Sequence, residues 1–170
     1  MLERTRFIKR LATAFLLAPS VNVASGAELP AAIAAPGELT VMQVHAEGAQ
    51  IYECKAEASG HLSWQFREPI AILLHDGATI GRHYAGPRWE IGKSIVLAKA
   101  VAKAPGAGPK DVPWLKLEIT DRQSGGPLGD ATTAQRINTI GGALEGECSK
   151  AGDLHAEPYS ADYVFLKKPN

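Results

Sequence analysis

The sequence has few of the residue patterns from which enzymes build recognisable catalytic or metal sites. Its 170 residues include two cysteines, neither in a Cys-x-x-Cys or Cys-x-His spacing. The five histidines form neither a His-x-His pair nor a His-Glu-x-x-His motif. The chain also lacks the Gly-x-Ser-x-Gly nucleophile elbow and a phosphate-binding loop. No motif therefore assigns a reaction, a cofactor or a metal. We expect no cofactor and no metal, and the missing motifs favour a protein without catalysis.

The chain also lacks an excess of charge of either sign. It has 18 basic and 18 acidic residues, and its longest basic run in the folded part is the pair Lys167-Lys168. Loss of residues 1–27 would lower the basic count from 18 to 14 and the acidic count from 18 to 17. A weakly acidic surface without basic clusters does not attract nucleic acid or anionic lipid, so we expect neither as a partner.

One long apolar run exists, and it lies near the N-terminus. Four basic residues (Arg4, Arg6, Lys9 and Arg10) precede the apolar stretch from Leu11 to Ala18, and Ser25-Gly26-Ala27 supplies small residues for cleavage. This order is typical of a secretory signal peptide. The alternative, a membrane anchor, needs roughly 20 apolar residues. We therefore predict a signal peptide at 1–27, a secreted or periplasmic location and no membrane span in the mature chain.

The mature chain, residues 28–170, has the length of one domain and can bury a core without a metal. Cys54 and Cys148 form an even pair, which in an exported protein predicts a disulfide. Such a bond would close a loop of about 95 residues and contribute ~4–5 kcal/mol through the unfolded state. The alternative is a catalytic or metal-binding thiol, for which neither cysteine has a suitable neighbour.

Short segments of alternating apolar and polar residues predict strands. Residues 28–39 contain two prolines and predict an extended segment, with a single β domain over 40–170. We expect a turn at Gly48 and a hairpin at Asp76-Gly77 that pairs a buried run, 70–75, with 79–84. Residues 132–139 fit either a helix or a strand. The other expected strands are 41–46, 50–54, 62–66, 88–91, 95–101, 115–119 and 162–166. About nine strands with little helix predict an all-β antiparallel barrel or sandwich.

Six blocks along the chain resemble a family of exported bacterial and fungal proteins, the domain-of-unknown-function family thirty-four fifty-five. The blocks are GAQIYECKA (48–56), WQFREP (64–69), GRHYAGPRWE (81–90), PWLKLEI (113–119), QRINTIGG (135–142) and PYSADYVFLKK (158–168). The resemblance covers roughly 29–168 and implies an exported single domain. It supplies no reaction, cofactor or catalytic residue that could be carried over to this chain. Members usually have an Asp-Gly-Ser turn after the Trp-Glu pair, so the shorter Ile91-Gly92-Lys93-Ser94 predicts a shorter hairpin here.

The densest group of functional side chains lies between Arg82 and Glu90. Alternation places Arg82 and Tyr84 on one face of a strand and His83 on the other, and it separates Trp89 from Glu90. A cavity lined by such residues would suit a small amphipathic ligand. The alternative is that Trp89 is core and the charges are solvated. Arg136 interrupts an apolar strand, where a charge either faces water or is held by a partner. Pairing with Glu90 would satisfy both groups. The ligand-binding candidates are Arg82, His83, Tyr84, Arg88, Trp89, Glu90 and Arg136.

Three classes of function fit this pattern. The first is an exported domain that binds a small molecule or a protein partner without catalysis, which the missing motifs favour. The second is an isomerase or hydrolase that uses His83 with a nearby carboxylate such as Glu90. The third is a surface interaction module. Two weaker possibilities are a zinc site from His75, Asp76 and His83, and a carbohydrate platform from two of Trp64, Trp89 and Trp114, which are more often core.

Overall fold

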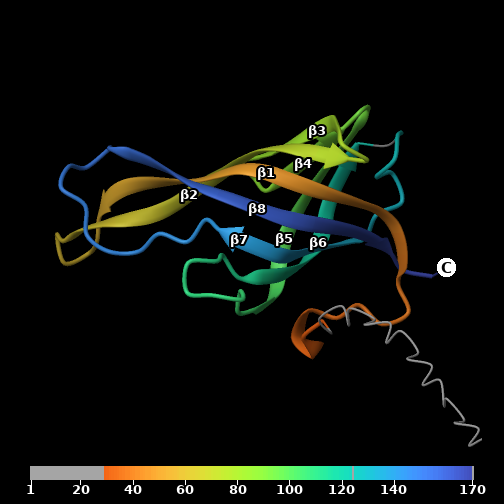
Figure 1. Ribbon diagram of the computed structural model, residues 1–170, viewed down its shortest axis with the longest axis horizontal. Helices are drawn as coiled ribbons and strands as arrows, with labels where there is room; N and C mark the ends of the chain where they lie inside the picture. The colour runs from red at the N-terminus through yellow and green to blue at the C-terminus, as the bar shows by residue number, and fades with distance from the viewer. Residues whose placement is uncertain (1–28, 124, 170) are drawn as a thin grey trace, which may run out of the picture.

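The computed structural model describes residues 29–123 and 125–169, and these form one closed antiparallel β-barrel (Figure 1). The ring order follows the chain order, and the first strand pairs with the last. The strands are β1 (Leu39–Ala56), β2 (Leu62–His75), β3 (Ala78–Tyr84), β4 (Arg88–Ile91), β5 (Ser94–Ala104), β6 (Trp114–Gln123), β7 (Thr133–Gly141) and β8 (Leu154–Lys167). This confirms the all-β prediction and decides between its two forms in favour of the barrel.

The described chain has eight strands rather than about nine, because two pairs of predicted strands are continuous. The segments 41–46 and 50–54 both belong to β1, and 62–66 and 70–75 both belong to β2. Gly48 is therefore not a turn. A Cβ built on Gly48 would lie 2.1 Å from the carbonyl oxygen of Ile70, so the glycine allows the close approach of β2.

The predicted hairpin at Asp76-Gly77 is confirmed, since Ala71 pairs with His83 and His75 with Ala78. The prediction that 70–75 is buried throughout is wrong. Ala71 and Leu73 face the interior, but Ile70 and Ile72 are 55% and 45% exposed. The wall of a barrel has one inner and one outer face, so alternate residues of even a continuous apolar strand reach solvent.

The ambiguous segment 132–139 is a strand, and the last strand begins at Leu154, well before the predicted 162. Both results follow from ring closure. Residues of β7 pair with β6 on one side and with β8 on the other, and β8 pairs with β1 over almost its full length. The turn between Ile91 and Ser94 has two residues, Gly92 and Lys93, as the short sequence there predicts.

Buried apolar side chains fill one end of the barrel, which we call the floor. The floor consists of buried core residues that do not line the cavity described below: Val44, Leu73, Ile91, Val96, Ile119, Leu128 and Phe165. Leu128 comes from the loop between β6 and β7, and its backbone N–H donates to the Ser94 hydroxyl. This loop therefore covers the floor end, where the β4–β5 turn also lies.

At the opposite end, β1, β2 and β8 continue beyond the other strands as an arm (Figure 1). Cys54 of β1 is bonded to Cys148, with 5.8 Å between their Cα atoms, which confirms the predicted disulfide. The bond holds the loop 142–153 against the arm. The backbone of this loop also bonds the arm directly, through Cys148 N–H to Leu62 O and Cys54 N–H to Asp153 O.

The segment before β1 packs on the outside of the barrel. It was expected to be extended, and it contains a one-turn 3-10 helix, η1 (Ala31–Ile33). Ile33 is fully buried, and its carbonyl accepts a hydrogen bond from Gln135 Nε2 at 2.7 Å. The predicted signal peptide, 1–27, lies outside the described residues.

No helix in the described part of the chain is long and apolar enough to span a membrane.

Candidate functional site

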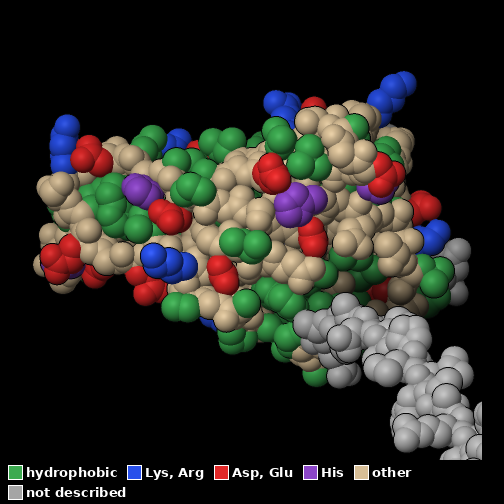
Figure 2. All heavy atoms as spheres, viewed as in Figure 1, with side chains coloured by type: hydrophobic (Ala, Val, Ile, Leu, Met, Phe, Trp, Pro, Cys, Tyr) green, Lys and Arg blue, Asp and Glu red, His purple; other side chains and the backbone are tan. Residues whose placement is uncertain are grey.

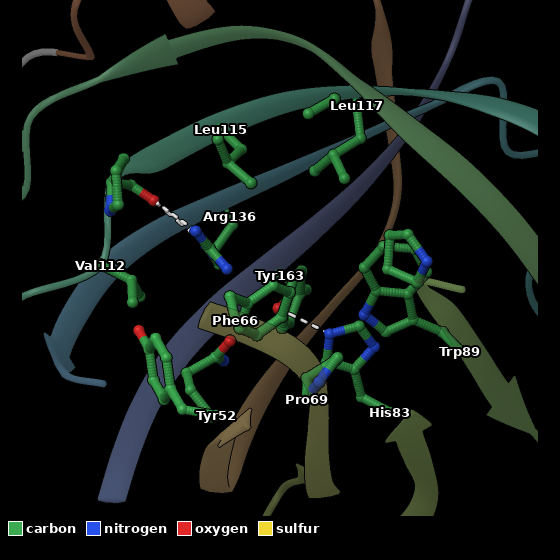
Figure 3. Close-up of a pocket in the computed structure, with 14 residues that line it drawn as sticks. Tyr52, Phe66, Pro69, His83, Trp89, Val112, Leu115, Leu117, Arg136 and Tyr163 are labelled. Carbon is green, nitrogen blue, oxygen red and sulfur yellow. Dashed lines mark hydrogen bonds between the residues drawn. The ribbon is translucent and has the colours of Figure 1, made fainter. Parts of the chain in front are cut away.

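A cavity of about 420 Å³ opens inside the barrel, between the floor and the arm. Every strand contributes to its lining, as do the β3–β4 turn and the loop before β6. Most of the lining is apolar or aromatic (Figure 3). The lining residues are Gln50, Tyr52, Phe66, Pro69, His83, Pro87, Trp89, Ala100, Val112, Pro113, Leu115, Leu117, Arg136 and Tyr163.

His83 and Trp89 lie at the inner end of the cavity on the paired strands β3 and β4. They are direct partners across the two strands, and their rings stack with centroids 4.5 Å apart and nearly parallel planes. Tyr163 of β8 approaches both rings edge-on, at 5.0 Å from His83 and 5.1 Å from Trp89. All three side chains are buried, so they form a rigid aromatic end to the cavity.

The hydrogen bonds of His83 fix its protonation. The carbonyl oxygen of Arg88 lies 2.8 Å from Nδ1 and can only accept, so Nδ1 carries the proton. Nε2 is then an acceptor, and the Tyr163 hydroxyl donates to it at 3.0 Å. The Tyr159 hydroxyl in turn donates to the Tyr163 oxygen at 3.4 Å. The chain Tyr159–Tyr163–His83–Arg88 therefore satisfies its own donors and acceptors.

The surroundings keep these groups uncharged. Burial lowers the pKa of His83 to about 4, against a weaker opposing effect of its bond to Arg88. Burial raises the pKa of Tyr163, and the positive charge of Arg136 opposes this in part. His83 is thus a neutral imidazole near pH 7, and Tyr163 a neutral phenol.

Arg136 reaches into the cavity from β7. Its Nε and Nη2 donate to the carbonyl oxygen of Pro113 at 3.1 Å and 2.8 Å (Figure 3). The residues around the guanidinium are largely apolar, among them Leu115, which is its direct partner on β6. No Asp or Glu lines the cavity, and none of the described carboxylates forms an ion pair with Arg136. The described residues therefore provide this cation with no paired carboxylate.

Two further polar side chains line the cavity from β1. The Tyr52 hydroxyl donates to Gly142 O at 2.7 Å and accepts from Leu144 N–H at 3.2 Å, so it links the cavity to the loop 142–153. Gln50 is 1% exposed, and its Nε2 has no hydrogen-bond partner among the described residues. A buried amide left in this way is unfavourable.

The other sequence candidates lie on the outer face of the same hairpin. Arg82 donates to Glu90 Oε2 through Nη2 at 2.8 Å, and its guanidinium lies over the Tyr84 ring. Tyr84 also donates to Glu90 at 3.3 Å. The predicted pair of Arg136 with Glu90 is therefore wrong, because alternation places the two side chains on opposite sides of the wall. Figure 2 shows acidic and basic side chains interspersed over the visible surface.

Three of the seven sequence candidates, His83, Trp89 and Arg136, thus line one cavity, and Arg82, Tyr84, Arg88 and Glu90 do not. The sequence reasoning missed Gln50, Tyr52, Phe66 and Tyr163. Their signal was present, since Gln50, Tyr52 and Cys54 alternate along one strand, and so do Tyr159, Ala161 and Tyr163. What was missing was the knowledge that β1 and β8 are neighbours in a ring.

The structure does not assemble the weaker candidate sites. No group of three or more His, Cys, Asp or Glu side chains in residues 29–123 and 125–169 is placed to hold a metal ion. His75 is on the outside near the hairpin turn, and His83 is in the interior. The three tryptophans share no exposed platform, since Trp89 is fully buried and Trp64 lies on the arm beside His155.

Comparison with known proteins places the chain in a family. No curated protein and no solved structure matches it. A family model described as "Protein of unknown function (DUF3455)" matches residues 35–79 and 75–167, which include every strand of the barrel and all of the cavity lining. The chain therefore belongs to the DUF3455 family.

Proposed function

We propose that this protein binds a small, largely apolar molecule inside the barrel and does so without catalysis. The observation that carries the proposal is the cavity of about 420 Å³, within a closed ring of strands, with an apolar and aromatic lining. Small-molecule sites commonly have volumes of roughly 300–1,000 Å³, a mainly apolar surface and a few polar groups that fix orientation. An eight-stranded barrel is wide enough to hold one small ligand.

The chemistry of the lining favours binding over catalysis. An acid–base mechanism with His83 needs a ring nitrogen within reach of the substrate, and the enzyme hypothesis pairs that imidazole with a nearby carboxylate. Both nitrogens of His83 are engaged, by Arg88 and by Tyr163, and no Asp or Glu lines the cavity. A pKa of about 4 leaves His83 neutral and a weak base near pH 7. These features support a fixed recognition surface.

We further propose that the protein acts outside the cytoplasm. The Cys54–Cys148 disulfide supports this, because such bonds persist in oxidising compartments and are rare in the cytosol. The N-terminal sequence, with its basic start, apolar run and small residues before position 28, is a second and independent support.

The test is a titration with N-phenyl-1-naphthylamine, a neutral apolar dye that fluoresces when it leaves water. The protein should bind one dye molecule, and Ala100→Trp should abolish binding by blocking the cavity with a large side chain, since Ala100 lines it at an exposed position. Val101→Trp is the matched control, because Val101 is 51% exposed on the same strand and does not line the cavity. Equal dye binding by both variants, or none by the unmodified protein, would refute the proposal.

A further inference from the structure

The cavity contains more hydrogen-bond donors than acceptors, and this imbalance describes its ligand. Three of its polar side chains are already satisfied. His83 and Tyr163 use their groups on one another and on Arg88 and Tyr159, and Tyr52 uses its hydroxyl on the loop 142–153. A ligand would gain little by competing for these bonds.

Most of the groups that remain are donors. Arg136 has five N–H groups; two bonds go to Pro113, and the guanidinium also lies close enough to the Tyr163 hydroxyl to lower the pKa of that group, so part of its donor capacity remains for a ligand. Trp89 Nε1 is buried without a partner among the described residues, and Gln50 Nε2 has no well-formed hydrogen bond there, although Gln50 lies close enough to the Tyr159 hydroxyl to lower the pKa of that group; both residues line the cavity. Each of these groups is unfavourable as it stands, and each would be stabilised by an acceptor atom brought by a ligand.

Charge points the same way. Arg136 is a permanent cation, and the cavity holds no carboxylate to neutralise it. The charge of Arg136 acts on the adjacent strand β8, since it lowers the pKa values of Tyr163, its direct partner there, and of Tyr159, against the larger raising effect of burial. It also lowers the pKa of His83 on β3. A guanidinium offers parallel N–H groups that match the two oxygens of a carboxylate.

We propose that the ligand is a small carboxylic acid with an apolar, ring-bearing body, and that Arg136 binds its carboxylate. The apolar body then lies against the aromatic and aliphatic lining provided by Trp89, Phe66 and Leu117. This inference rests on the proposed function and adds the charge and chemical class of the ligand. The donor surplus, rather than the cavity volume, carries it.

The experiment compares two probes that share one apolar body, 2-naphthoate and 2-naphthalenemethanol, by displacement of bound N-phenyl-1-naphthylamine at pH 7.5. We expect the acid to bind at least about tenfold more tightly than the alcohol, the difference that one charge-assisted hydrogen bond produces. Arg136→Met should remove this preference and still bind the neutral dye. Arg82→Met is the matched control, since Arg82 lies on the outer face with Glu90, and it should keep the preference.

The outcomes separate this inference from the proposed function. Three results would overturn the carboxylate assignment: equal affinity for the acid and the alcohol, displacement of the dye by neither probe, or a preference for the acid that survives Arg136→Met. In each case, binding of the dye itself would leave the cavity proposal intact. Failure of the dye itself to bind refutes both. If Arg136→Met does not fold, Arg136→Lys provides the comparison. It keeps the charge without the two-pronged geometry, so a reduced preference supports the inference and an undiminished one contradicts it.

Discussion

The interior of this barrel is filled differently in its two halves. In the floor, side chains such as Leu73, Val96 and Phe165 are fully buried and leave no room for a ligand. In the half toward the arm, the interior is lined by larger aromatic and polar side chains around an open volume. Trp89 lies at the boundary, since its ring contacts Phe165 on one side and stacks on His83 on the other.

The comparison indicates that hydrophobic packing and the proposed ligand binding lie at different ends of one barrel. The floor supplies hydrophobic stabilisation and needs no polar group. The open half loses that stabilisation and replaces it with fixed connections, namely the His83–Tyr163–Tyr159 hydrogen bonds, the link from Tyr52 to the loop 142–153, and the disulfide. Three predictions test whether this division holds.

The largest effect should come from the disulfide, because it stabilises the end of the molecule that has the least packing. Replacement of both Cys54 and Cys148 by Ala releases a loop closed over a separation of 94 residues. The chain-entropy model gives a loss of about 4–5 kcal/mol in the free energy of unfolding. Urea denaturation of the double variant measures this loss. A midpoint equal to that of the unmodified protein would show that the open half is stable without its cross-link.

Two phenylalanines provide a direct contrast between the halves. Phe165 is fully buried in the floor, so Phe165→Ala should lower the free energy of unfolding by about 3–5 kcal/mol. Phe66 lines the cavity but is 55% exposed, so Phe66→Ala should lower it by about 1 kcal/mol or less. The same urea titration checks both variants. Similar losses at the two positions would mean that the cavity-lining half is packed as tightly as the floor.

The smallest of the three effects is a dependence of stability on pH. The pKa of His83 is about 4 in the folded protein and about 6.5 in the unfolded chain, which therefore binds more protons between these values. Stability should be complete above about pH 6.5 and fall as the pH decreases toward 4, with up to about 3 kcal/mol due to His83. His83→Gln should flatten this part of the profile of denaturation midpoint against pH.

The control for this prediction is His61→Gln, which changes an exposed histidine on the arm. Its profile should keep the slope of the unmodified protein between pH 4 and 6.5. If His83→Gln keeps that slope as well, the imidazole is not buried as a neutral group and the hydrogen-bond chain to Tyr163 is not maintained in solution.

The features that the sequence predicts well are those that depend on neighbours along the chain. Alternation correctly placed Arg82 and Tyr84 on one face and His83 on the other, and Asp76-Gly77 marked a real hairpin. The pairing of Cys54 with Cys148 requires no spatial knowledge, because a chain with two cysteines has one possible intramolecular bond.

The failures depend on residues far apart in the chain. The sequence pattern predicts a turn at Gly48, because a glycine that permits the close approach of a neighbouring strand cannot be distinguished in the sequence from a glycine that bends the chain. The opposite charges of Arg136 and Glu90 suggest an ion pair. Whether the two side chains can meet depends on which side of the barrel wall each one faces and on how many strands separate β4 from β7 around the ring. Gln50 and Tyr163 were missed because only barrel closure brings β1 beside β8.

Closure of the ring also has a consequence for how the protein is made. Leu39 of the first strand is paired with Lys167 of the last, so one edge of β1 has no partner until nearly the whole chain has been synthesised. Contacts of such long sequence separation make folding slow, and an unpaired edge can pair with other chains in the meantime. Folding yield, more than the stability of the finished barrel, should therefore limit how much of this protein a cell or an expression host can produce.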